Sequence, residues 1–243
     1  MNKRRKFLMS IRRVSDAFAE RMLVRPPAPE RVDTGLAPES LPARVSPWDD
    51  PRDTVIIQDV SGSMGLCDYR PTRLAGGVQA ATVHVKTCAQ KRPDDRVAIV
   101  SFHTSARHVL PLTPVTHKKV ILDALAGLSA DGGTNLATGL EAVVEIFENE
   151  PVSNRSRHTI LQTDGQGGEP LAVAAELKEG LGVVIDVVGI GGSPREVNEA
   201  LLRQVATTEP DGSSHYRFVK DPQTLCEHYR RLATGLIWTG EER

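Results

Sequence analysis

From residue 53 onward, short apolar runs alternate with stretches whose apolar residues recur at steps of three and four. Several of the runs are almost continuously Val, Ile and Leu, which is typical of strands whose two sheet faces are both covered by helices. The steps of three and four predict those helices. The expected strands are residues 53–60, 95–102, 107–112, 157–164, 182–191 and 215–221, and the expected helices are residues 72–92, 116–128, 134–150, 169–181, 194–208 and 222–236.

The order of these segments predicts an α/β fold with a doubly wound, mostly parallel six-stranded sheet and helices on both faces. Alternation of strand and helix implies right-handed crossovers between parallel strands. Residues 107–112 follow the strand at 95–102 after only four residues. These two strands are therefore expected to form an antiparallel hairpin.

Two further segments precede this domain, which we place at residues 53–243. Residues 1–24 place Phe7, Ile11 and their apolar neighbours on one helical face with Lys and Arg around it, which predicts a basic amphipathic helix. Residues 25–52 contain seven prolines and are expected to form an extended linker or arm.

Charge is distributed unevenly along the chain, although the formal net charge is −1. Residues 1–24 hold seven basic and two acidic residues, a net charge of +5, which leaves a net charge of −6 for the remainder. A mildly acidic body does not favour binding to nucleic acid. For the basic helix two interpretations stay open. It docks on a partner or makes weak contact with a membrane surface, or it packs back on the domain or frays.

Cysteine usage and the absence of long apolar runs bear on location. Cys67, Cys88 and Cys226 are odd in number and show no CxxC spacing, which fits free thiols in a reducing compartment. No apolar run reaches the length of a membrane span. Near the start, Ser10 and Arg12 interrupt any apolar core of a signal peptide. We therefore expect a cytoplasmic protein.

Small oxygen-bearing side chains gather where three expected elements meet a loop. Asp59, Ser61 and Ser63 leave the first strand in the stretch "QDVSGSMG". Thr134 follows two glycines at the start of an expected helix, and Asp164 lies just past the end of another buried strand. In an open α/β sheet, ligands bind at the carboxyl ends of the strands where the strand order reverses, so these side chains are expected to converge.

The converging groups comprise two carboxylates and three hydroxyls, all of them hard oxygen donors. Mg²⁺ takes six such oxygens in an octahedron and keeps several waters. Hydroxyls are weak, neutral ligands, so the ion stays electrophilic and favours an anionic ligand from outside. The residues thus predict a Mg²⁺ or Mn²⁺ site that captures a carboxylate of a partner.

This combination resembles the von Willebrand factor type A family. DxSxS (Asp59, Ser61, Ser63), the later Thr134 and the TDG aspartate (Asp164) match all five positions of that family's metal-ion-dependent adhesion site, in the family's order. The resemblance runs from about residue 53 to residue 236 and points to a bacterial intracellular member. It implies a Rossmann-like sheet with one antiparallel edge strand and a protein-binding role rather than catalysis. "LCDYRPT", between the metal motif and the next helix, is longer than in many relatives, so it would shape partner choice or cap the site.

Simpler interpretations stand beside the metal site. Thr134 could be only a helix N-cap and TDG only a tight turn; a site that binds no metal is a further alternative. His84 and Cys88 lie four residues apart on one helix, but no second pair completes a zinc site, so packing is favoured. Asp186 interrupts the apolar run "VVIDVV" and needs a hydrogen-bonding partner there.

Three functions are compared. The first is a metal-dependent binding module with no catalytic role. It would serve as a subunit or adaptor of a multiprotein complex. The resemblance implies an AAA+ ATPase, or a kinase and phosphatase system, as the class of partner. The second is a structural component that assembles through its N-terminal arm. The third is a Mg²⁺-dependent phosphohydrolase with Asp59 as nucleophile. Against it, Ser61 stands where a second acid is expected, and no Lys or Arg accompanies the motif to clamp a phosphoryl group.

Overall fold

The computed structural model describes residues 50–165 and 167–235. The predicted helix at residues 1–24 and all but the last residues of the predicted arm lie outside this part of the chain. Within it, no helix is both long enough and apolar enough to cross a membrane.

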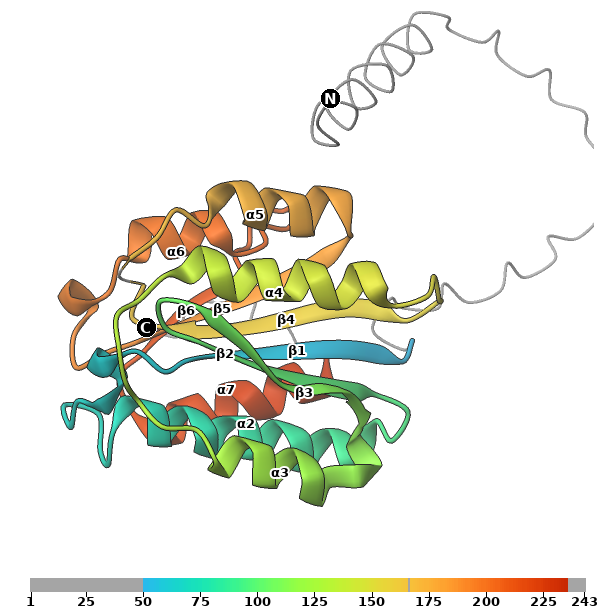
Figure 1. The fold of residues 1–243 in the computed structure, drawn as a ribbon, viewed down its shortest axis with the longest axis horizontal. Coiled ribbons are helices and arrows are strands. Elements are labelled where there is room, and N and C mark those ends of the chain that lie inside the picture. Colours follow the sequence, from blue (N-terminus) through green and yellow to red (C-terminus); the bar gives the residue numbers. More distant parts are fainter. Residues whose placement is uncertain (1–49, 166, 236–243) are drawn as a thin grey trace, which may run out of the picture. The chain divides into compact units, whose positions relative to one another are not determined.

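Six strands form one sheet in the order β3-β2-β1-β4-β5-β6 (Figure 1). Neighbouring strands pair in parallel except β2 and β3, which pair antiparallel and put β3 at the edge. The predicted fold class and the hairpin are therefore confirmed. The strands are β1 (Arg52–Asp59), β2 (Arg96–Phe102), β3 (Ala106–Pro114), β4 (Ser156–Thr163), β5 (Val183–Ile190) and β6 (Tyr216–Val219).

Helices cover both faces of the sheet, as Figure 1 shows. On one face lie α2 (Arg73–Lys91), α3 (Lys118–Ala126) and α7 (Pro222–Thr234). On the other lie α4 (Leu136–Asn149), α5 (Leu171–Ala175) and α6 (Glu199–Val205). Short helical turns complete the set: η1 (Gly62–Gly65), η2 (Val115–His117), η3 (Glu176–Gly180) and η4 (Pro194–Glu196).

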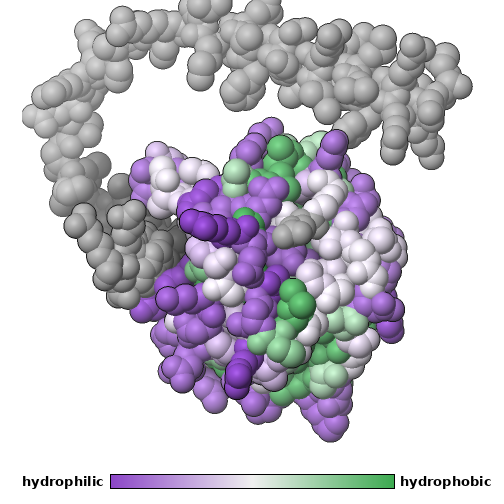
Figure 2. All heavy atoms as spheres, turned by 90° about the vertical axis from the view of Figure 1, so that its left-hand side faces the viewer, coloured by the Kyte–Doolittle hydropathy of each residue, from purple (hydrophilic) through white to green (hydrophobic). Residues whose placement is uncertain are grey.

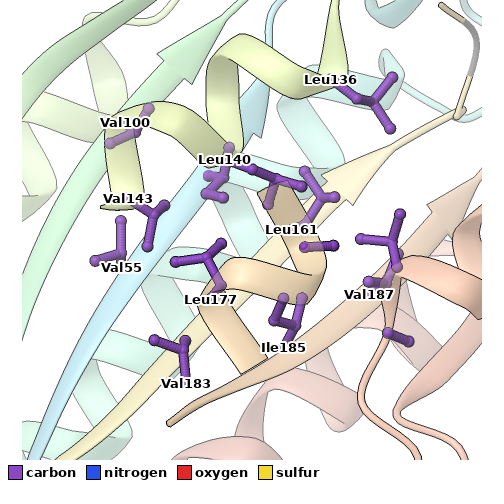
Figure 3. Close-up of a cluster of buried hydrophobic side chains, with 14 of the residues drawn as sticks. Val55, Val100, Leu136, Leu140, Val143, Leu161, Leu177, Val183, Ile185 and Val187 are labelled. Atoms are coloured by element: carbon purple, nitrogen blue, oxygen red, sulfur yellow. The ribbon is translucent and has the colours of Figure 1, made fainter. Parts of the chain in front are cut away.

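The two helix layers explain why the strands read as continuous apolar runs. In β1, Val55 and Ile57 face the cluster under α4, whereas Ile56 faces the cluster under α2. Each of these side chains is fully buried. Figure 3 shows the first cluster, where Leu140 and Val143 of α4 meet strand residues from β1, β4 and β5. Burial of an aliphatic side chain of this size contributes about 1.5–3 kcal/mol.

Two predicted helices are interrupted. The segment 169–181 forms α5 and then continues as a π-helical turn, η3. The segment 194–208 breaks after η4, and α6 begins only after Asn198, whose side chain accepts the N–H of Leu201 as an N-cap. An Asn at this position offers the backbone an alternative to a continuous helix.

Candidate metal centre

The predicted site lies where the strand order reverses. β1 pairs with β2 on one side and with β4 on the other, so the chain leaves β1 for one half of the sheet and later returns to build the other. The carboxyl ends of β1 and β4 point to the left-hand edge in Figure 1. Figure 2 turns this edge towards the viewer and shows a largely hydrophilic surface with hydrophobic residues in small separate areas.

Asp59 is the last residue of β1 and is fully buried. Its Oδ1 accepts the N–H of Ser61 at 2.8 Å, and its Oδ2 accepts the hydroxyl of Thr163 at 2.6 Å. The Thr163 oxygen in turn accepts the N–H of Gly165 at 2.9 Å. Burial raises the pKa of Asp59 to about 6, against the hydrogen bonds from Ser61 and Thr163 and with a smaller contribution from the charge of Asp164. The carboxylate is thus fixed in place but poorly solvated.

The two serines lie beyond the strand. Ser61 is buried and precedes η1, which contains Ser63, and their Oγ atoms are 3.2 Å apart. Two neighbouring ligands of an octahedral ion at 2.0–2.1 Å are about 2.9 Å apart. The spacing of the serine hydroxyls therefore fits adjacent positions around Mg²⁺, with a small approach required of each.

The loop that carries Thr134 is held against the other two loops by its main chain. Gly62 donates its N–H to the carbonyl of Gly132 at 3.0 Å, and Leu136 donates to the carbonyl of Gly167 at 3.3 Å. A Cβ on Gly167 would lie 2.4 Å from the carbonyl oxygen of Thr134, so only glycine allows this approach. The structure thus brings together the three segments that contain the predicted ligands.

Thr134 is not the N-cap of the following helix. The cap of α4 is Asn135, whose side-chain oxygen accepts the N–H of Ala137 at 3.2 Å. The alternative that Thr134 is present only to cap the helix is therefore wrong.

Asp164 follows β4, is fully buried, and pairs with a residue that the sequence did not single out. Its Oδ2 lies 3.2 Å from Nη1 of Arg73, the first residue of α2. A basic residue, Arg73, thus reaches the site through the fold, ten residues after Ser63, although the sequence indicated no Lys or Arg placed to clamp a phosphoryl group. Its guanidinium is engaged by carboxylates. A signal existed in the sequence, since a cation in the first turn of a helix is unfavourable unless it has an acidic partner.

The segment "LCDYRPT" is anchored beside this arginine. Asp68 accepts hydrogen bonds from Nε and Nη2 of Arg73, and the ring of Tyr69 is buried against Gly76 of α2. Leu66 and Cys67 are exposed on the same segment. The segment is therefore fixed at its centre and open to partners at its beginning.

Three other residues have the surroundings that the sequence predicted. Asp186 in β5 is buried and bonds Nδ1 of His215 at 2.8 Å, which supplies the partner expected for it. His84 and Cys88 are buried on α2, with Nε2 and Sγ 3.5 Å apart. Among residues 50–165 and 167–235, no group of three or more His, Cys, Asp or Glu side chains could hold a metal. The candidate site contains two such side chains, Asp59 and Asp164, with three hydroxyls beside them.

A cavity of about 460 Å³ lies at the opposite ends of the strands, where β4 and β5 begin. Its lining includes Arg155, His158 and Leu181. None of the five predicted ligands lines it, so it is separate from the candidate metal centre.

A profile of the von Willebrand factor type A domain matches residues 54–166, which include all five candidate ligands. An uncharacterized protein of Escherichia coli (strain K12), YfbK, is 27% identical over 184 residues, which are 73% of this chain and 29% of that protein. The chain thus spans less than a third of this relative's length.

Solved structures agree with this match. The von Willebrand factor type A protein from Catenulispora acidiphila is 26% identical, with a TM-score of 0.58 over 76% of this chain and 42% of that one. The hypothetical protein BatB from Bacteroides thetaiotaomicron shares the fold at 21% identity, with a TM-score of 0.63 over 76% of this chain and 98% of that one.

Proposed function

We propose that this chain binds a protein partner through a metal ion, in the manner of the von Willebrand factor type A domain, an adhesion and interaction module whose profile matches residues 54–166. Asp59, Ser61, Ser63, Thr134 and Asp164 would hold Mg²⁺ or Mn²⁺, and the partner would contribute an Asp or Glu side chain. Binding, not catalysis, is the proposed role.

The observation that carries this proposal is the convergence of the three loops at the reversal of strand order. Main-chain hydrogen bonds join the loop after β1 to the loop before α4, and that loop to the one after β4. All side-chain donors in these loops that the proposal uses are hard oxygens, which suits Mg²⁺ and disfavours softer metals. The 3.2 Å spacing of the serine hydroxyls fits two adjacent ligand positions.

The chemistry of the donors explains why a partner would be needed. When bound, a divalent ion supplies a positive charge that draws an anionic oxygen into its shell. Ser61, Ser63 and Thr134 contribute no negative charge, and only Asp59 and Asp164 do. The buried, poorly solvated Asp59 is also a group that a nearby cation would stabilise.

The proposed setting is a cytoplasmic multiprotein complex in a bacterium, with this chain as a subunit or adaptor. An AAA+ ATPase, or a kinase and phosphatase system, is the proposed class of partner, on the family resemblance alone. The three cysteines are free, as a reducing compartment would leave them.

A pull-down with and without Mg²⁺ tests the proposal. The wild-type chain should capture an acidic partner in Mg²⁺, and both EDTA and Asp59→Ala should abolish capture. Asp123→Ala serves as the matched control, because Asp123 is an exposed acid whose partner, Lys119, lies four residues away on the same helix. Undiminished capture by Asp59→Ala would refute the proposal.

The same samples distinguish the alternatives. Assembly that survives Asp59→Ala but disappears when residues 1–52 are removed would indicate the arm as the binding element. Phosphate release that disappears in Asp59→Ala would indicate a phosphohydrolase. In the structure, however, the guanidinium of Arg73 is engaged by three carboxylates, which leaves it poorly placed to clamp a phosphoryl group.

A further inference from the structure

A single guanidinium joins the candidate metal centre to two neighbouring loops. Arg73 is 3% exposed. Its Nη1 lies 3.2 Å from Asp164, its Nη2 lies 2.5 Å from Asp68 and 2.7 Å from Glu196, and its Nε lies 2.9 Å from Asp68. Asp68 belongs to the loop before α2, and Glu196 to η4 after β5. Three segments thus meet on one buried cation.

The position of this guanidinium costs free energy unless acidic groups surround it. Arg73 opens α2, where the helix dipole disfavours positive charge, and its side chain is removed from water. The surrounding acids compensate for this cost. Chiefly because Arg73 donates hydrogen bonds to Asp68, the pKa of Arg73 is raised despite its burial. The same bonds, with the N–H of Gly192, lower the pKa of Asp68 to about 2.

We propose that Arg73 is a positioning residue that sets the charge of the metal centre: it lowers the affinity for the metal and raises the affinity of the bound metal for a carboxylate. This inference rests on the proposed function. Arg73 orients one oxygen of Asp164 and places a positive charge behind it. That charge opposes a bound cation and offsets part of the negative charge that an incoming carboxylate would meet.

Arg73 also restrains two other carboxylates. Asp68 and Glu196 have side chains that are 29% and 44% exposed, so burial does not fix them in place. In the structure the guanidinium binds both of them, and the N–H of Gly192 bonds Asp68 at 2.8 Å and Glu196 at 3.1 Å. Loss of Arg73 would free local negative charge, which strengthens metal binding and weakens carboxylate binding. The loss of the positive charge of Arg73 acts in the same direction, because it also strengthens metal binding and weakens carboxylate binding.

The test measures two affinities on the full chain. Mn²⁺ binding is followed by the electron paramagnetic resonance signal of the free ion. Acetate binding to the Mn²⁺-loaded protein is followed by water-proton relaxation. Arg73→Gln should bind Mn²⁺ about tenfold more tightly and acetate about tenfold more weakly, as expected for one charge at short range in a partly screened site. Arg195→Gln, which removes an exposed cation next to Glu196, should change neither affinity.

A purely structural role for Arg73 predicts a different pattern, in which Arg73→Gln weakens both affinities. That result, or no change in either, would overturn the inference. Asp68→Asn keeps the proposal testable if Arg73→Gln does not fold, because it removes a partly exposed acid. Asp68→Asn should act in the opposite direction, with Mn²⁺ bound about threefold more weakly and acetate more tightly. Equal or reversed effects in Asp68→Asn would also overturn it.

The two proposals fail in distinguishable ways. If the wild-type chain does not bind Mn²⁺, the metal-dependent function itself is refuted. If it binds Mn²⁺ and acetate, but the variants do not shift the two affinities in opposite directions, only the role of Arg73 is refuted.

Discussion

Replacement of Thr163 by valine tests whether the candidate metal centre depends on hydrogen bonds around its ligands. Thr163 ends β4, and its hydroxyl donates to Asp59 at 2.6 Å and accepts from Gly165 at 2.9 Å. Valine has almost the same shape, so Thr163→Val removes both bonds without opening a cavity. The change therefore isolates the contribution of one hydroxyl.

The magnitude follows from the two bonds. A hydrogen bond to a charged group contributes about 1.5–3 kcal/mol, and an unsatisfied buried N–H such as that of Gly165 costs about 1–3 kcal/mol. We expect Thr163→Val to lower the free energy of unfolding by about 3 kcal/mol. For a domain of this size that lowers the melting temperature by about 6–12 °C. Metal affinity should fall by about 10–100-fold, because the hydroxyl orients a ligand.

Two control variants separate stability from metal binding. Thr163→Ser keeps the hydroxyl and should remain close to the wild type in both measurements. Thr159→Val removes a buried hydroxyl from the same strand, one that donates to the carbonyl of Val55 at 3.1 Å and not to a candidate ligand. It should lower stability but leave Mn²⁺ affinity unchanged. Urea unfolding and Mn²⁺ titration provide the two readouts. Equal Mn²⁺ affinity in Thr163→Val and Thr159→Val would refute the reasoning.

Two further predictions concern the fold. The two ring nitrogens of His215 lie 2.8 Å from Asp186 and 2.8 Å from Glu209. Burial lowers the pKa of His215, but the two carboxylates more than offset this effect, so its pKa is raised above the usual value of 6.5. The resulting stabilisation is present below pH 6.5 and lost as the pH rises through the folded-state pKa, and Glu209→Gln should flatten this dependence in urea unfolding. Gly77→Ala should destabilise the domain by about 2 kcal/mol, because overpacking exceeds the gain in helix propensity of about 1 kcal/mol. The new Cβ would lie 1.7 Å from Nε2 of Gln162, and a more stable variant in chemical denaturation would contradict this.

The elements that the sequence predicted well are those with a local cause. β1, β4 and β5 are recognisable because helices cover both faces of the sheet, which favours consecutive apolar residues such as those at 55–57 in β1, 160–161 in β4 and 187–188 in β5. Asp59 and Asp164 are identifiable as candidates because each lies two or three positions beyond such apolar residues. The reversal of strand order brings the loops after the two strands to one edge of the sheet, so the order of elements alone predicts that they are neighbours.

What the sequence did not predict depends on contacts between distant residues. The position of Arg73 in the first turn of a helix indicates an acidic partner, but Asp164 and Glu196 lie 91 and 123 positions away, so no local pattern identifies them. The π-helical turn at Glu176–Gly180 keeps an apolar face much like that of an α-helix, so periodicity does not distinguish the two. The break before α6 did have a local signal, the capping side chain of Asn198, which the apolar period concealed.

The loops of the candidate site are joined through main-chain atoms, by bonds such as Gly62 to Gly132, Asp131 to Val60 and Leu136 to Gly167. None of these bonds involves a side chain that is proposed to touch the metal. These main-chain bonds stay in place when Ser61, Ser63 or Thr134 is exchanged, whereas Asp59 and Asp164 also hold their neighbours through Thr163 and Arg73. For protein engineering, substitutions at the hydroxyl positions are therefore a way to change the preference for an ion while the backbone of this edge of the sheet is kept.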